Sequence, residues 1–408
     1  MPYLSKFESD TLFGNALEII DTSGLSALSL RALSAKANIS PSSISYRFGS
    51  RDGFIEDLVI SLVEQEAHIW RERRNALLEH TIGPEQSVRF CNAVILNHFS
   101  RYRAHANALW EFELVGNRVS FLPELLHQWR QPEIAFWETF LEQIEMPVDL
   151  APTLSGTTTG IGRSLLLSCP GTEQLIWTQD CVSRLFERLQ KQPLTMPCSP
   201  GMPAGPALAS DINPIDRKDL DPSSTADRIV LTASEIILEQ GCSGLSHRAI
   251  ANRANISLSS TTHHFETLQD ILMAAFRHIY AEGLKGSGLP KGNENGYSQA
   301  FFFDKLVQRL SKANAVTSPA AIALEDIMLQ GSKIDTMRDI ARALFALMGT
   351  HSTQMLARLE DVSPRCDRLD GYLFRYGLIG SKYLDGPELR VLGNQDFLAF
   401  WRYYLASS

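Results

Sequence analysis

Apolar residues recur at spacings of three and four positions along most of the chain, which is the pattern of amphipathic helices. The first such segment is expected to bury one face, formed by Leu12, Ala16, Leu17, Ile19 and Ile20. Gly24 should end this helix, because glycine readily adopts the left-handed conformation that closes many helices. Similar segments continue to the end of the chain, so the sequence predicts an all-α protein.

Three further pieces follow, each opened by its own capping residue. Ser29 is expected to cap a second helix and Asn38 to break it. Ser40 and Pro41 restart a third helix, since proline at the first helical position loses no hydrogen bond. Ser50 should cap a fourth helix, which is expected to be long because its apolar stripe is sustained.

The third of these helices is expected to have one apolar edge, formed by Ile44 and Phe48, and a polar outer side. The outer side carries hydroxyls, one aromatic ring and one guanidinium: Ser42, Ser43, Ser45, Tyr46 and Arg47. A short polar helix propped on a small apolar bundle suits insertion into a DNA major groove. The same geometry also occurs in proteins that touch no DNA, so the pattern alone leaves both interpretations open.

This stretch occurs twice, at residues 16–55 and 233–272. The second copy follows the first without a gap at a constant offset of 217 residues (233 minus 16), and we call this spacing the repeat offset. A self-match of this length predicts two structural repeats. The second copy differs at three positions of the expected DNA-facing surface, where Tyr46, Arg47 and Arg51 are replaced by His263, His264 and Leu268.

The first copy resembles the N-terminal DNA-binding region of the TetR-type transcriptional regulators. The residues that carry the resemblance are Ala16, Ile19, Ile20, Gly24, Leu28, Arg31, Ala37, Ser40, Ile44, Tyr46, Phe48, Ser50 and Arg51. The second copy resembles the same region at Ala233, Ile236, Ile237, Gly241, Leu245, Arg248, Ile250, Ala251, Ala254, Ser257 and Phe265. The resemblance implies a DNA-binding regulator that represses transcription until a small ligand releases it.

Contacts to a double-stranded DNA operator are therefore expected from both copies. In the first copy the candidate residues are Ser29, Arg31, Ser40, Pro41, Ser42, Ser43, Ser45, Tyr46, Arg47 and Arg51. In the second copy they are Ser246, Ser257, Ser259, Ser260, Thr262, His263 and His264. The second copy is expected to keep the fold, but it has Leu268 where the first copy has the basic Arg51.

Composition and charge narrow the function further. A formal net charge of −8 over 408 residues argues against a protein that coats nucleic acid by charge alone, so basic residues must act locally. No segment approaches the roughly 18 apolar residues of a membrane span, and the N-terminus lacks the pattern of a signal peptide, so a cytoplasmic protein is expected. The six cysteines are scattered and predict free thiols, with no metal site and no cofactor.

An enzyme is not expected. The sequence offers no nucleophile with a base, no carboxylate pair at a defined spacing and no cofactor loop. The glycine-rich stretch Leu154–Cys169 lacks the spacing of a phosphate-binding loop. Its small residues instead predict close packing of two helices.

The expected domains are a first helix-turn-helix domain (1–60), a first helical ligand-binding and dimerisation domain (61–191), a Pro/Gly-rich linker (192–224), a second helix-turn-helix domain (225–275) and a second helical domain (276–408). The last helix pairs, 154–191 and 367–405, are expected to form one four-helix bundle within the chain, because the resembling regulators pair through their last two helices. The chain would then be an intramolecular pseudo-dimer, with a homodimer as the alternative.

Many aromatic residues fall in the first helical domain. They predict either an ordinary apolar core or a cavity for an unknown small hydrophobic effector. The candidate ligand-binding residues are Phe99, Trp110, Phe112, His127 and Trp137. A competing interpretation of the whole chain is a ligand-sensing or protein-interaction scaffold whose second helix-turn-helix no longer binds DNA.

Overall fold

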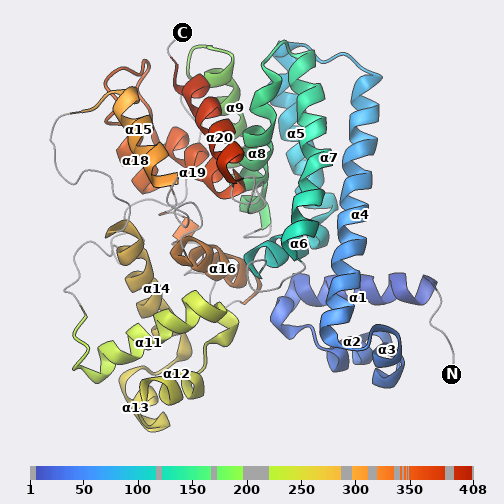
Figure 1. Cartoon of the computed structure of the whole chain (residues 1–408), viewed down its shortest axis with the longest axis vertical. Helices are drawn as coiled ribbons and strands as arrows, with labels where there is room; N and C mark the ends of the chain where they lie inside the picture. Colours follow the sequence, from blue (N-terminus) through green and yellow to red (C-terminus); the bar gives the residue numbers. More distant parts are fainter. Residues whose placement is uncertain are drawn as a thin grey trace.

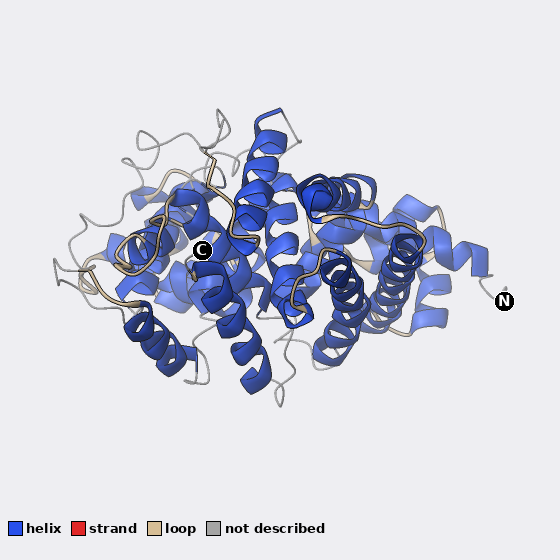
Figure 2. Cartoon of the chain, turned by 90° about the horizontal axis from the view of Figure 1, so that it is seen from above, coloured by secondary structure: helices blue, strands red, loops and turns tan. Residues whose placement is uncertain are grey.

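The computed structural model (Figure 1) describes residues 6–115, 122–166, 172–195, 220–285, 296–310, 319–334, 349–381 and 390–406, with isolated positions between 341 and 347. Within these residues the chain is all-α, as predicted, with 18 helices and no strand (Figure 2). None of the described helices combines the length and apolar character needed to cross a membrane. Most of the predicted linker, residues 196–219, lies outside the described residues.

The N-terminal elements are α1 (Lys6–Ser23), the 3-10 turn η1 (Leu25–Ala27), α2 (Leu30–Ala37), α3 (Pro41–Phe48) and the long α4 (Arg51–Leu78). We call α1 to α3 with the start of α4 the first head. Its predicted caps are confirmed: the hydroxyls of Ser29, Ser40 and Ser50 each accept a hydrogen bond from the backbone N–H three residues later. Asn38 ends α2 with a left-handed φ of 54°.

A second set of helices has the same order: α11 (Thr225–Gln240), η6 (Cys242–Gly244), α12 (His247–Ala254), α13 (Leu258–His264) and α14 (Leu268–Lys285). We call α11 to α13 the second head. Its backbone has the same special conformations at the repeat offset, with φ of 80° at Gly241 and 52° at Asn255. Ser246 and Ser257 cap its short helices.

The remaining helices of the first half are α5 (Ser87–Arg101), α6 (Arg103–Val115), α7 (Leu122–Gln143), α8 (Ala151–Leu166) and α9 (Thr172–Leu189). Those of the second half are α15 (Gln299–Leu310), α16 (Pro319–Lys333), α18 (Thr350–Leu356), α19 (Arg368–Ser381) and α20 (Arg390–Leu405). The two heads lie at one end of the molecule and α8, α9, α19 and α20 at the other, with α16 between them (Figure 1).

The helices α8, α9, α19 and α20 all contact one another and form a four-helix bundle. Close approach of α8 and α19 depends on small residues, because a Cβ at Gly160 would lie 2.6 Å from the Cβ of Tyr376. On the opposite helix, a Cβ at Gly377 would lie 3.1 Å from the hydroxyl of Thr157. The small residues of the glycine-rich stretch therefore bring two helices together, as predicted.

Buried charges join the two halves inside this bundle. The guanidinium of Arg188 donates from Nε to Asp370 Oδ1 (3.1 Å), and that of Arg184 donates from Nη1 to Asp370 Oδ2 (3.2 Å). Tyr404 donates its hydroxyl to the same carboxylate at 2.8 Å. All four side chains are almost fully buried, so each charge depends on its partners for the stabilisation that water would otherwise give.

Replacing the glycine between α8 and α19 should destabilise the fold. We expect Gly160→Ala to lower the free energy of unfolding by about 1–3 kcal/mol, since the new methyl group overpacks the bundle. The matched control is Gly14→Ala on an exposed position of α1, where a new Cβ meets nothing within 4 Å. This control should gain about 0.5–1 kcal/mol from helix propensity. Equal effects in urea-unfolding curves of the two variants would contradict the close-packing account.

Candidate nucleic-acid interface

Helix α3 is held by its apolar edge and presents its polar side outward. Ile44 and Phe48 are buried, and the Phe48 ring packs edge-on against Phe54 with 5.0 Å between centroids. Tyr46, on the opposite side, has 63% of its surface exposed. The helix therefore has a fixed orientation and an accessible aromatic hydroxyl, which is the arrangement that groove insertion needs.

Hydroxyl groups cluster at the N-terminus of α3. The Ser40 hydroxyl lies 2.9 Å from that of Ser42 and 2.8 Å from that of Ser43. Ser45 is exposed one turn further on, and Pro41 is exposed at the first helical position. Hydroxyls can both donate and accept hydrogen bonds, so this cluster can contact either phosphates or base edges.

The basic residues of the first head differ in the contacts that they make within the protein. Arg31 is exposed on α2, and the Arg47 guanidinium lies over the Phe48 ring at 5.3 Å. Lys36 forms an ion pair with Glu18 of α1 at 2.6 Å. Arg51 donates from Nε to the carbonyl of Leu28 (2.6 Å) and from Nη2 to that of Leu25 (3.1 Å), so it braces the turn before α2. A phosphate contact by Arg51 stays a prediction, and it would have to use N–H groups of the guanidinium that do not already donate to Leu25 and Leu28.

The second head repeats the hydroxyl cluster and keeps one exposed cation, Arg248 at the position of Arg31, but not the cations of positions 47 and 51. The Ser257 hydroxyl lies 2.8 Å from the hydroxyls of both Ser259 and Ser260. Thr262 is exposed, and its hydroxyl donates to the carbonyl of Ser259. Where the first head has Tyr46 and Arg47, this head has two exposed imidazoles, His263 and His264, with 5.2 Å between ring centroids.

Two further substitutions change the chemistry of the second head. Leu258, 54% exposed, occupies the position of Pro41 and adds an apolar group to the outer face. Arg253 occupies the position of Lys36 and is held by two carboxylates, with both Nη atoms 2.6 Å from Glu239 and Nε 3.2 Å from Glu235. The second head therefore has less positive charge to offer a phosphate backbone than the first.

The described candidate effector residues lie in different parts of the first half. Phe99, Trp110 and Trp137 are buried in the core of the first half, with Phe99 packed against Gly162 and Trp137 against Phe136. Phe112 is buried below the first head. The side chain of His127 lies outside the described part of the structure. Of this set, Phe112 borders the pocket described next, and an effector role of the five residues stays a prediction.

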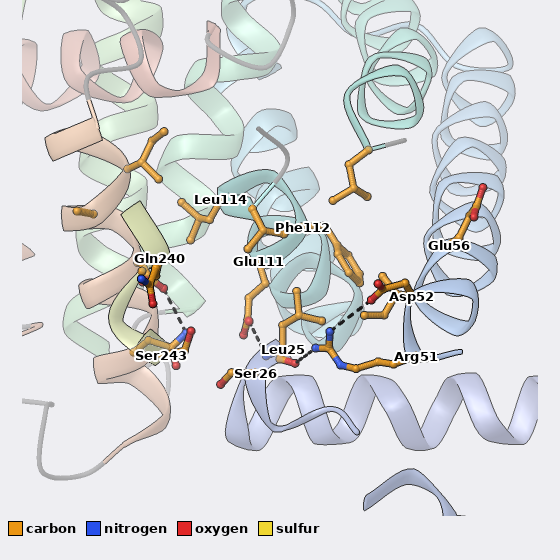
Figure 3. Close-up of a pocket in the computed structure, with 18 of the residues that line it drawn as sticks. Leu25, Ser26, Arg51, Asp52, Glu56, Glu111, Phe112, Leu114, Gln240 and Ser243 are labelled. Carbon is orange, nitrogen blue, oxygen red and sulfur yellow. Dashed lines mark hydrogen bonds and ion pairs between the residues drawn. The ribbon is translucent and has the colours of Figure 1, made fainter. Parts of the chain in front are cut away.

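A pocket of about 780 Å³ lies between the two heads (Figure 3). One wall comes from η1, the start of α4 and the end of α6, and the other from the end of α11, η6 and α16. Each wall has one acid that fixes the turn of its own head. Glu111 of α6 accepts a hydrogen bond from the backbone N–H of Leu25 at 2.6 Å, and Asp326 of α16 accepts one from that of Cys242, also at 2.6 Å. Leu25 and Cys242 are separated by the repeat offset, so the two acids have equivalent roles.

One buried ion pair joins the walls. Lys333, at the end of α16, contacts the carboxylate of Glu111 and donates to the carbonyl of Ile20 at 2.7 Å. Both charged side chains are nearly inaccessible to solvent. Burial raises the pKa of Glu111, while the lysine ammonium acts to lower it. Sequence reasoning missed this pair and the pocket, because the two partners come from opposite halves of the chain and neither lies in a recognisable motif.

The first head matches a known protein family. Residues 13–58 match the model of the family described as bacterial regulatory proteins, tetR family. Regulators of this family are non-enzymatic DNA-binding proteins, and most act as repressors. Comparison of the whole chain with curated proteins gave no match. The family match implies a DNA-binding transcriptional regulator and locates one DNA-binding domain in the first head.

A buried acid in the core of the first half should make stability depend on pH. Burial, together with the nearby Glu133, raises the pKa of Glu66 from its usual 4.5 to about 7. Glu66 Oε1 accepts a hydrogen bond from Trp70 Nε1 (2.9 Å) and lies 3.2 Å from His98 Nε2. Burial also lowers the pKa of His98 well below its usual range, so the imidazole is neutral at pH 7.

The folded state holds the proton on Glu66 more tightly than the unfolded state does. The contribution of Glu66 to the free energy of unfolding is therefore complete below pH 4.5 and is lost as pH rises through about 7. The loss is on the order of 3 kcal/mol. We expect Glu66→Gln, which cannot ionise, to gain stability relative to the native chain between pH 5 and pH 8, as urea unfolding would measure. Glu72→Gln, an exposed change on the same helix, should show no such gain. If the difference in free energy of unfolding between Glu66→Gln and the native chain does not change with pH, the shifted pKa is contradicted.

Proposed function

We propose that this chain, which carries a TetR-type DNA-binding domain at residues 13–58, is a sequence-specific transcriptional repressor that works as a single-chain pseudo-dimer. The observation that carries the proposal is the first head itself. Its α3 presents the exposed Tyr46 and Arg47 beside a hydroxyl cluster, on a scaffold fixed by Ile44 and Phe48. This surface has the size and the donor set of a helix that reads base edges.

A second head in the same chain supports the pseudo-dimer. Helix-turn-helix regulators commonly read two half-sites about 34 Å apart through a two-fold dimer. Here α11 to α13 have the same caps and special backbone conformations as α1 to α3, and both sets lie at the same end of the molecule (Figure 1). One chain would then supply both readers of one operator.

The charges inside the bundle also favour pairing of unlike halves. At the repeat offset, Arg184 of the first half corresponds to Trp401 of the second, and Asp370 of the second half corresponds to Thr153 of the first. If two first halves from different chains paired instead, Arg184 would face a threonine and have no aspartate. If two second halves paired, Asp370 would face a tryptophan. The first arrangement leaves Arg184 with Glu187 of its own helix and no carboxylate from the partner. The second leaves Asp370 buried without a guanidinium, which typically costs about 3–5 kcal/mol, so the halves are complementary to each other rather than to themselves.

The two heads are expected to read different half-sites. Tyr46 and Arg47 in the first head correspond to His263 and His264 in the second, so an imidazole stands where the first head has a guanidinium. We therefore propose an operator that is an imperfect palindrome or a single strong half-site. Release by a small effector would follow from its higher affinity for a head spacing that does not fit successive major grooves.

A second function is favoured by one observation in the second head. Its Arg253 is paired with Glu235 and Glu239, which leaves Arg248 as the exposed arginine of its two short helices. If the head does not read DNA, the second half would serve as a sensor or an interaction scaffold attached to one DNA-binding domain.

Selection of bound duplexes from a random oligonucleotide pool tests DNA reading directly. An arginine contact to DNA is typically worth about 1–3 kcal/mol, so Arg47→Ala should weaken binding to the enriched sequence roughly tenfold to a hundredfold. The matched control is Arg71→Ala, which removes the same charge from an exposed position on α4, about 30 Å along the helix from Arg51. It should change the affinity little. If no sequence is enriched at low salt, the repressor proposal is wrong.

Breaking the charge network of the bundle tests the pairing of the halves. Asp370→Asn should lower the free energy of unfolding by about 3–5 kcal/mol, because the buried Arg188 guanidinium loses its paired carboxylate, while Arg184 keeps Asp367 and Glu187. The control, Tyr404→Phe, removes one hydrogen bond to the same carboxylate and should cost only about 1 kcal/mol. Sedimentation of the native chain should give a monomer. A native dimer, or an Asp370→Asn variant as stable as the control, would contradict intramolecular pairing.

A further inference from the structure

We propose that the pocket between the heads binds a small organic cation with a flat apolar body, and that this ligand links the two halves. The site shares only Phe112 with the effector residues expected in the first helical domain. Its effect on DNA binding rests on the proposed function, whereas ligand binding itself does not.

The pocket combines an apolar floor with polar edges. The floor is formed mainly by buried side chains of both halves: Leu25, Phe112, Leu114, Leu122 and Ala323. Its volume of about 780 Å³ falls in the range of small-molecule sites. Contact with this floor would remove apolar surface of the ligand from water, which favours a flat aromatic body over a simple ion.

The charges around the floor select the sign of the ligand. Four carboxylates line the pocket, on Asp52, Glu56, Glu111 and Asp326, against one guanidinium, on Arg51. Glu111 is already compensated by Lys333. The Arg51 guanidinium donates to two backbone carbonyls and lies 3.8 Å from Asp52 (Figure 3). The remaining excess is negative, so an ammonium or amidinium group is favoured and a carboxylate is repelled.

Each wall includes residues of a different head, and this makes occupancy sensitive to head position. Ser26 and Ser243 occupy equivalent positions of η1 and η6, and both line the pocket. Gln330 of α16 reaches across to Gly24, where an added Cβ would lie 3.1 Å from its side-chain oxygen. A ligand that contacts both walls binds most tightly when the heads have this arrangement, so it shifts the population of head spacings towards it.

Three ligands with one indole body and different charges test the proposal: tryptamine, 3-ethylindole and indole-3-acetate. Calorimetric titration of the full chain without DNA should give tryptamine a Kd below about 1 mM and an affinity at least about tenfold above those of the neutral and anionic compounds. Glu56→Gln on one wall and Ser243→Arg on the other should each weaken tryptamine at least about threefold. Both positions are exposed, so the fold should tolerate the changes.

The matched control is Glu64→Gln, an exposed charge removal on α4 away from the pocket, which should leave tryptamine binding unchanged. The proposed site would be overturned by equal binding of the three indoles or by preference for the anion. It would also be overturned if tryptamine does not bind at 10 mM, roughly the weak limit of a specific site, or if binding is lost in Glu64→Gln alone. The coupling is then measured on the selected operator, where saturating tryptamine should change DNA affinity at least about fivefold. Wall-dependent tryptamine binding by a chain that selects no DNA would keep the site and reject the repressor function.

Discussion

The buried carboxylate of Asp370 is the interaction on which the rest of the arrangement depends. It accepts from Arg184, Arg188 and Tyr404, and so binds α9 of the first half to α19 and α20 of the second. Buried ion pairs add little net stability over apolar packing, but they strongly penalise every arrangement in which a partner is missing. The network therefore selects which helices pair. The close contact at Gly160 then sets how near they lie.

A second set of contacts joins the two halves at the other end of the molecule. Helix α16 reaches the first head through Lys333, which contacts Glu111 and the end of α1 at Ile20. Because Glu111 also holds the backbone of Leu25, the second half contacts the same turn that orients α2 and α3. The two halves are thus joined by buried polar contacts in two places, in the bundle and beside the heads. A ligand that binds beside these contacts, as proposed, would favour one spacing of the two heads.

Local features could be predicted from the sequence, and long-range ones could not. The caps at Ser29, Ser40 and Ser50 depend on neighbours three residues away, and the helical periodicity of each segment depends only on its own residues. The hydrogen bonds from Arg51 to the carbonyls of Leu25 and Leu28 have no local signal, because α2 and α3 separate these residues in the sequence. Rings such as Trp137 suggested either a cavity or a core, because packing between helices, not periodicity, decides between the two.

The central claim is that one chain reads one operator with two unlike heads. Native mass spectrometry of the complex with a selected duplex, together with hydroxyl-radical footprinting, tests it most directly. The account predicts one chain per duplex and two protected regions about one helical turn apart (roughly 34 Å), one more strongly protected than the other. Two chains on each duplex, with equal protection of two identical half-sites, would contradict it and assign the pairing to first heads of separate chains.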